Sequence, residues 1–333
     1  MPKSENQKQK LLYILKFFYE ETDEDHAISV QQIIEKLDHY GISAARRSVY
    51  DDIRTLKEFG FDIIMQKNKS YSYFLGSRLF ETAELKILID SIQSSRFITK
   101  KKSEAIIKKL RSLASKPQSR QFPGQIYIYD RIKNQNECIF YSVDKLHHAI
   151  AENLKISFQY FDYNIKREKI FRKNGDIYIT NPMAMTFDNE NYYLIAYNEK
   201  YKDYIHYRVD KMADITVLSD KRVVPESRFN AADYVKPMFS MFDGETENIT
   251  AIFHNSYLNV VIDRFDDNVR LSEADGYDEC FKAVFKAAVS PTFLSWMFGF
   301  GIGVRIISPQ WVVDEVKEYA FQIAEMYAEP ENE

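Results

Sequence analysis

Apolar residues recur with helical spacing in three consecutive segments of the first 60 residues. Each segment carries one apolar stripe: Leu11, Ile14, Leu15 and Phe18 in the first, Ile33, Ile34 and Leu37 in the second, and Val49, Ile53 and Leu56 in the third. A stripe at i, i+3 or i+4, and i+7 is typical of a helix with one buried face. The pattern therefore predicts three amphipathic helices, the last of them within residues 43–60.

Polar residues at the ends of these segments support the same interpretation. Ser29 is followed three residues later by Gln32, which is the spacing of a capping box, and Gly41 stands where a helix ends in the left-handed conformation. After Gly60, two β-branched and aromatic runs flank a polar tip at residues 67–70, which predicts a hairpin. Three helices followed by a hairpin predict a winged helix-turn-helix over residues 8–76.

In such a domain the third helix reads the major groove of DNA and the hairpin contacts phosphates. The planar guanidinium group of arginine can form paired hydrogen bonds with a guanine edge or with phosphate oxygens. A basic amphipathic helix alone is weak evidence, because most such helices are only solvated, so the neighbouring elements carry the prediction. The predicted DNA-binding residues are Arg47, Asp51 and Arg54 on the outward face, Arg46, Ser48 and Tyr50 at its flanks, and Lys67 and Lys69 in the hairpin.

The pattern changes twice in the remainder of the chain. Residues 82–95 and 103–114 predict two connecting helices, residues 116–124 a linker, and residues 142–153 a further helix. Five short aromatic-rich strands then predict a small barrel or strongly bent sheet: residues 156–161, 168–173, 177–187, 191–198 and 203–218. From residue 247 onward, the order strand, helix, strand, strand, helix, strand predicts a ferredoxin-like split βαβ unit followed by a last helix.

The strand-rich segment resembles a WYL domain. That pattern runs from a proline through an aromatic-Tyr-Leu triplet to an aromatic-Arg-x-Asp-basic run, here NPMAMTF, Tyr192-Tyr193-Leu194 and Tyr207-Arg208-Val209-Asp210-Lys211. Two positions depart from it, because Tyr192 replaces Trp and Lys211 stands where Arg is usual. The C-terminal part, with its run GFGIGVRIISPQWV, resembles the extension that follows WYL domains in bacterial regulators.

The resemblance implies an α+β multidomain transcriptional regulator with four parts. These are a winged helix-turn-helix (1–78), a helical connector (79–135), a small Sm/SH3-like β-barrel as the WYL domain (136–222) and a ferredoxin-like C-terminal domain (245–333). The WYL domain would sense a nucleotide or single-stranded nucleic acid as effector. Tyr160, Tyr193 and Tyr207 are predicted to stack on bases, and Arg167, Arg208 and Lys211 to hold phosphate. The alternative for each tyrosine is a place in the core, since tyrosines on alternating strands often cap one.

The distribution of charge along the sequence agrees with nucleic-acid binding by the N-terminal part of the chain. The chain as a whole has a net charge of −4 and a pI near 6.0, which does not suggest such a partner. Residues 1–120, however, hold 22 basic against 16 acidic residues, net +6, whereas residues 121–333 are net −10. Nine basic residues and one Glu lie between Arg96 and Arg120; they form either a solvated helix face or a contact with the DNA backbone.

Several function classes find no support in the sequence. Cys138 and Cys280 are far apart and have no CxxC or His partners, and His147-His148 has no second ligand pair, so no metal site is expected. No Ser-His-Asp set, P-loop or other catalytic motif is visible, so we expect neither an enzyme nor a cofactor. No apolar run is long enough to span a bilayer and the N-terminus lacks a signal-peptide core, which predicts a cytoplasmic protein.

Two hypotheses from different classes follow. The first is a homodimeric regulator that binds a double-stranded DNA operator, with repression favoured; a dimer is expected because one winged helix reads too few base pairs for high specificity. The second is an accessory protein that binds RNA or single strands through the WYL domain, with residues 1–76 used for dimerisation.

Overall fold

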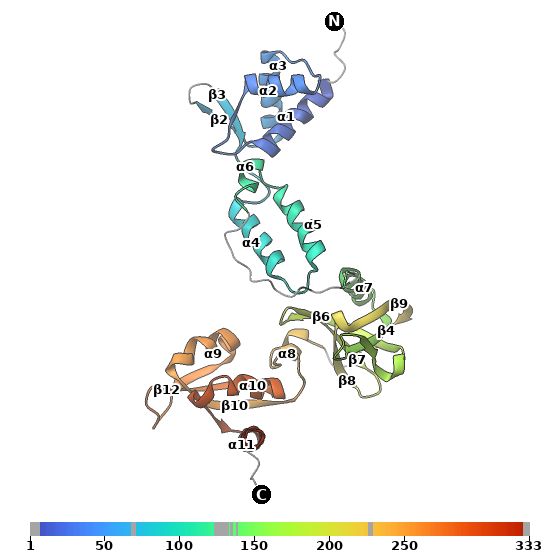
Figure 1. Ribbon diagram of the computed structural model, residues 1–333, viewed down its shortest axis with the longest axis vertical. Coiled ribbons are helices and arrows are strands. Elements are labelled where there is room, and N and C mark those ends of the chain that lie inside the picture. Colours follow the sequence, from blue (N-terminus) through green and yellow to red (C-terminus); the bar gives the residue numbers. More distant parts are fainter. Residues whose placement is uncertain are drawn as a thin grey trace. The chain divides into compact units, whose positions relative to one another are not determined.

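The structure is a computed structural model that describes residues 7–67, 71–122, 133, 136–137, 139–225 and 229–328. The chain forms two compact units, Met1–Glu137 and Cys138–Glu333. Figure 1 shows the helices and strands that form the two units. None of the helices in the described ranges is long and apolar enough to cross a membrane.

The first unit begins with three helices and a small antiparallel sheet. Its elements are α1 (Gln7–Glu21), β1 (Ile28–Ser29), α2 (Val30–His39), α3 (Arg46–Phe59), β2 (Ile63–Lys67) and β3 (Tyr71–Leu75). The strands pair in the order β1-β3-β2. The three predicted helices and the hairpin strands are confirmed, and the sequence missed only the two-residue strand β1, which joins the hairpin.

The apolar stripes form the core of this part as predicted. Most stripe residues are fully buried, whereas three remain only partly buried, namely Leu11, Leu15 and Ile34. The capping box is present, because Ser29 accepts from the Gln32 amide while the Gln32 side chain accepts from the Ser29 amide. Gly41 (φ 71°) and Gly60 (φ 114°) follow their helices in the left-handed region that glycine tolerates best.

The connector contains α4 (Thr82–Ser94), α5 (Lys100–Arg111) and the short helix α6 (Lys116–Ser119). The prediction of a linker from residue 116 was wrong for this helix. Ser115 caps it in a second capping box, and the Ser115 hydroxyl also donates to Asp23 Oδ2 at 2.6 Å. Lys116 Nζ lies 2.8 Å from Glu20 Oε2, so α6 is tied to the end of α1. Residues 120–122 of the predicted linker form turns and a bend after α6, and its last two residues, Pro123 and Gly124, lie outside the described residues.

The second unit begins with a helix and a curled antiparallel sheet. The elements are α7 (Ile139–Ala151), β4 (Leu154–Tyr163), β5 (Lys169–Phe171), β6 (Tyr178–Asp188), β7 (Asn191–Asn198), β8 (Asp203–Arg208) and β9 (Met212–Lys221). The strand order is β5-β4-β6-β7-β8, and β9 also pairs with β4. Register shifts interrupt β4 and β6, and such bulges bend a sheet. The single strand predicted over 203–218 is two strands, because a 3-10 turn at Val209–Lys211 divides it.

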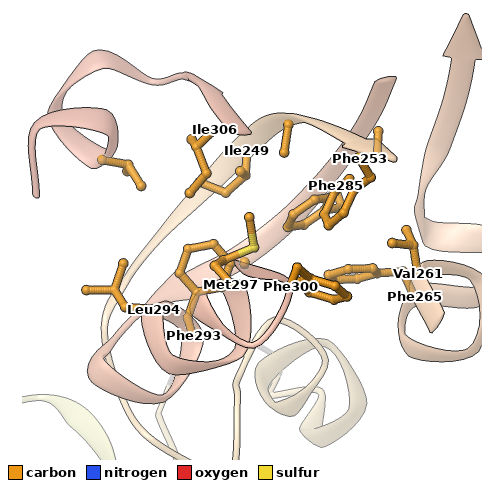
Figure 2. Packing of buried hydrophobic residues seen from close by; sticks show 14 of the residues in the cluster. Ile249, Phe253, Val261, Phe265, Phe285, Phe293, Leu294, Met297, Phe300 and Ile306 are labelled. Carbon is orange, nitrogen blue, oxygen red and sulfur yellow. The ribbon is translucent and has the colours of Figure 1, made fainter. Parts of the chain in front are cut away.

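The remaining elements build a four-stranded sheet with helices. They are α8 (Ala231–Val235), β10 (Glu245–His254), α9 (Leu258–Phe265), β11 (Arg270–Glu273), β12 (Cys280–Val289), α10 (Pro291–Phe298), β13 (Val304–Ser308) and α11 (Gln310–Met326). The order β11-β12-β10-β13, antiparallel throughout, is that of a split βαβ unit, as predicted. Figure 2 shows the core, where side chains of the strands such as Phe253 and Phe285 meet helical ones such as Phe265 and Met297.

Candidate functional site

The outward face of α3 presents the predicted arginines to solvent. Val49, Ile53 and Leu56 are buried on the opposite face, so the helix orientation is fixed by the core. Arg54 Nη2 donates to Asp51 Oδ1 at 2.8 Å, and its side chain is still 68% exposed. Arg47 is exposed and has no ion-pair partner among the residues that the structure describes. This guanidinium is therefore available to an anionic partner.

The predicted DNA-binding residues at the flanks of α3 and in the hairpin differ in their surroundings. Arg46 Nη2 donates to the Tyr50 hydroxyl at 3.5 Å, and both side chains are exposed. Ser48 behaves differently, because its hydroxyl accepts a hydrogen bond from Lys10 Nζ and is directed toward α1. Lys67 is exposed, with Nζ 5.6 Å from the centre of the Tyr71 ring. Lys69, the other predicted hairpin contact, lies outside the described residues.

Lys10 is a residue that the sequence analysis missed. Its side chain is 2% exposed, and its Nζ lies 2.7 Å from Asp52 Oδ2 in addition to its bond with Ser48. Ser48 and Asp52 are one turn apart on α3, so one buried ammonium holds two points of that helix against α1. Lys10 lies four residues before Ile14, on the apolar stripe of α1, and a charge at that position was the available signal.

Arg78 joins the end of α1 to the segment that enters the connector. Its guanidinium donates to the carbonyl oxygens of Tyr19 at 2.7 Å, Thr22 at 2.6 Å and Phe18 at 3.3 Å. These carbonyls belong to the last turn of α1 and its exit, where a helix lacks its own donors. Arg78, which follows the hairpin in sequence, thus provides hydrogen-bond donors to the carbonyl groups at the C-terminal end of α1.

In the second unit, two of the predicted tyrosines lie in one aromatic cluster. The rings of Tyr160 and Tyr207 are 5.4 Å apart, and both contact Phe158 and Tyr178 at 5.1 to 6.3 Å. Tyr160 is 7% exposed, and its hydroxyl accepts from the Arg208 amide at 3.1 Å. Burial, followed by the neighbouring tyrosines, raises the pKa of Tyr207 to about 12. Tyr193 packs elsewhere, in a buried cluster with Met238 and Met241.

Cations surround this cluster. Asp162 Oδ2 accepts from Arg172 Nε and its Oδ1 from Lys211 Nζ, both at 2.6 Å. These two hydrogen bonds, with Arg172 the stronger, lower the pKa of Asp162 to about 2. The Arg172 guanidinium lies 5.1 Å from the centre of the Tyr160 ring, and Lys173 Nζ lies 4.4 Å from that of Tyr178. The sequence pattern predicted a ligand contact for Lys211 but for neither Arg172 nor Lys173.

Arg208 and Arg167 occupy different environments. Arg208 makes a two-bond contact with Asp210, Nε to Oδ1 at 3.1 Å and Nη2 to Oδ2 at 2.9 Å, and Nη2 also donates to Asn191 Oδ1 at 3.0 Å. The hydrogen bond that Arg208 donates to the Asp210 carboxylate raises the pKa of Arg208 above its ordinary value. Its side chain remains 38% exposed, so a further anion can reach it. Arg167 lies in the exposed turn between β4 and β5 with a φ of 63°.

The comparisons place this site in a known domain class. The family model of the WYL domain matches residues 142–217, so the WYL resemblance is confirmed for this segment. That range includes Tyr160, Tyr193, Tyr207 and Arg208 together with the newly found Arg172.

Two solved structures have low similarity to the chain. Proteasome accessory factor B/C (PafBC) of Arthrobacter aurescens has 15% identity and a TM-score of 0.28 over 93% of this chain, and this chain spans 45% of its length. A CRISPR Cas-related protein has 13% identity and a TM-score of 0.34 over 75% of this chain and 74% of its own. No match was found among curated protein sequences.

Proposed function

We propose that the protein is a DNA-binding transcriptional regulator whose WYL domain senses a ligand that carries phosphate. In this proposal residues 1–78 of the first unit are a winged helix-turn-helix, α3 is the recognition helix, and β2 and β3 form the wing. The protein acts as a homodimer on an operator with two half-sites, by binding and without catalysis.

The proposal rests mainly on α3, which has one buried apolar side and one exposed side that carries arginines. Its apolar side is buried and its position is fixed by Lys10, whereas Arg47 and Arg54 extend from the other side. A rigid helix with outward arginines suits bidentate contact with guanine edges. The ion pair of Arg54 with Asp51 is exposed, so it costs little to exchange for a base or a phosphate.

The cations around the aromatic cluster support the sensing role. Arg172 lies over the ring of Tyr160 and Lys173 over that of Tyr178, and Lys211 shares Asp162 with Arg172. The Arg208 amide donates to the Tyr160 hydroxyl, and the four side chains provide donors for phosphate oxygens. A nucleotide or a short single-stranded nucleic acid would combine phosphate with bases for the aromatic rings. We propose repression as the outcome of operator binding, since a bound dimer blocks access to the duplex.

The test is a selection of full-length protein on a library of random duplexes. Affinity is then measured for the enriched duplex and a shuffled one between about 50 and 200 mM salt. Arg47→Ala should cost about 1–3 kcal/mol on the enriched duplex only. Arg270→Ala is the matched control, because Arg270 is also exposed but lies on β11. The proposal fails if no sequence is enriched, or if both variants bind like the wild type.

The same binding assay tests the alternative function. If the protein is an RNA- or single-strand-binding accessory factor, single strands will bind with or without Arg47, and Arg208→Ala will abolish binding. Tight binding of single strands with no duplex preference would favour this second function over the first.

A further inference from the structure

The C-terminal domain contains a cavity of about 440 Å³ that the proposed DNA and effector sites do not use. It lies where the end of α10, strand β13 and helix α11 meet. Its walls include Met297, Val304, Ile306 and Val313. Figure 2 shows Met297 and Ile306 in the same apolar layer as the phenylalanine core, so this layer forms one wall of the cavity.

Helix α11 packs beside β13, and residues of both elements line the cavity. Val312 is completely buried, and Tyr319 contacts the Phe298 ring at 5.5 Å, so the helix is attached on both sides of Val313 and Val316. Val313 and Val316 lie between these two points of attachment and line the cavity without filling it. Gly301, which also lines the cavity, has no heavy atom within 4 Å of where a Cβ would stand. The lining residues Gly301, Ile307 and Gln310 are exposed, so the cavity opens to solvent and a ligand can enter it.

The charge of the cavity is opposite to that of its surroundings. Residues 121–333 are net −10, yet Arg305 and Lys317 line the cavity, and no Asp or Glu among the described residues does so. Arg305 Nη1 has one long contact with the Tyr277 hydroxyl at 3.4 Å, and Lys317 Nζ contacts Asp314 along the same helix at 3.2 Å. Both cations are exposed at the rim and can turn toward a ligand. Gln310 adds an amide group beside them.

An apolar chamber with a cationic rim fits one class of ligand. The volume lies within the range of small-molecule sites, which are mostly apolar with a few polar groups that fix orientation. We infer that this cavity binds an amphipathic carboxylate, with its apolar tail against Met297 and Val313 and its carboxylate at Arg305 and Lys317. The inference concerns a second ligand site and does not depend on DNA binding.

The chain supplies its own reporter for this ligand. Its two tryptophans, Trp296 and Trp311, are the sequence neighbours of the lining residues Met297 and Gln310. We would titrate full-length protein with decanoate and, in parallel, with the neutral analogue decan-1-ol, and follow tryptophan fluorescence. The expected result is saturable binding of one molecule per chain, with decanoate about tenfold tighter because of its charge-assisted hydrogen bonds.

Two kinds of variant make the test specific, with calorimetry as the readout. Val313→Phe, and independently Val316→Phe, should fill the cavity and abolish binding of both ligands. Arg305→Gln should remove the preference for decanoate while decan-1-ol binds as before. Lys286→Gln is the control, because Lys286 is an exposed cation on β12 that does not line the cavity. The inference is overturned if decanoate does not saturate, if it binds no tighter than decan-1-ol, or if the phenylalanine variants bind normally. Duplex binding measured on the same samples keeps this outcome separate from that of the proposed function.

Discussion

Replacing Lys10 by Met tests how the recognition helix is held. The substitution keeps the length of the side chain and removes its charge, which leaves the Asp52 carboxylate without its buried partner. Breaking a fully buried ion pair from one side costs about 3–5 kcal/mol. Asp52 is 20% exposed, so part of its charge is still solvated, and we expect a cost at or below the lower end, about 2–3 kcal/mol.

Hydrogen exchange of the α3 amides is the appropriate assay, because both tryptophans lie in the second unit and do not report on this helix. A cost of about 2–3 kcal/mol corresponds to exchange roughly 30- to 150-fold faster where the amides open by unfolding of this part. The double variant Lys10→Met with Asp52→Leu removes both charges and should recover most of the loss. Unchanged α3 exchange in the single variant would refute the anchoring role of Lys10.

Three further predictions concern other parts of the molecule. Ser29→Ala removes the capping box of α2 and should lower stability by about 1 kcal/mol, measured as the melting temperature against the exposed control Ser272→Ala. Arg78→Met leaves carbonyls at the end of α1 without donors and should increase amide exchange in the last turn of that helix, whereas exchange in α9 should not change. The pKa of Asp162 is depressed to about 2, so its ion pairs stabilise the fold above pH 4 and are lost as the pH falls toward 2. The loss of stability in Asp162→Asn, measured by urea unfolding, should therefore become smaller between pH 4 and pH 2, and a loss that stays constant would contradict this.

Local patterns were sufficient to predict most of the secondary structure. Ser29 with Gln32, and the glycines at 41 and 60, define helix ends through contacts within a few residues, which sequence alone contains. The partner of Lys10 could not be predicted in the same way. Ser48 is 38 residues away in sequence, and only the packing of α1 against α3 brings the two side chains together.

The candidate ligand site shows a similar division. The strand positions of Tyr160 and Tyr207 follow from their sequence pattern, and the structure brings both into one cluster. Arg172 and Lys173 were missed because residues 168–173 read as a continuous strand, whereas the strand ends at Phe171 and Lys173 adopts a left-handed conformation. Alternation along β7 also does not reveal what covers Tyr193, since Met238 and Met241 come from a segment much later in the chain.

Control of operator binding by the WYL domain can be measured through thermodynamic linkage between the two ligands. The dissociation constant of the enriched duplex is measured with and without a saturating single-stranded oligothymidylate, whose binding is monitored by native mass spectrometry. We expect the dissociation constant to change at least about fivefold in the wild type and not to change in Arg172→Ala. An identical dissociation constant with the oligonucleotide demonstrably bound would show that the WYL domain does not control operator binding.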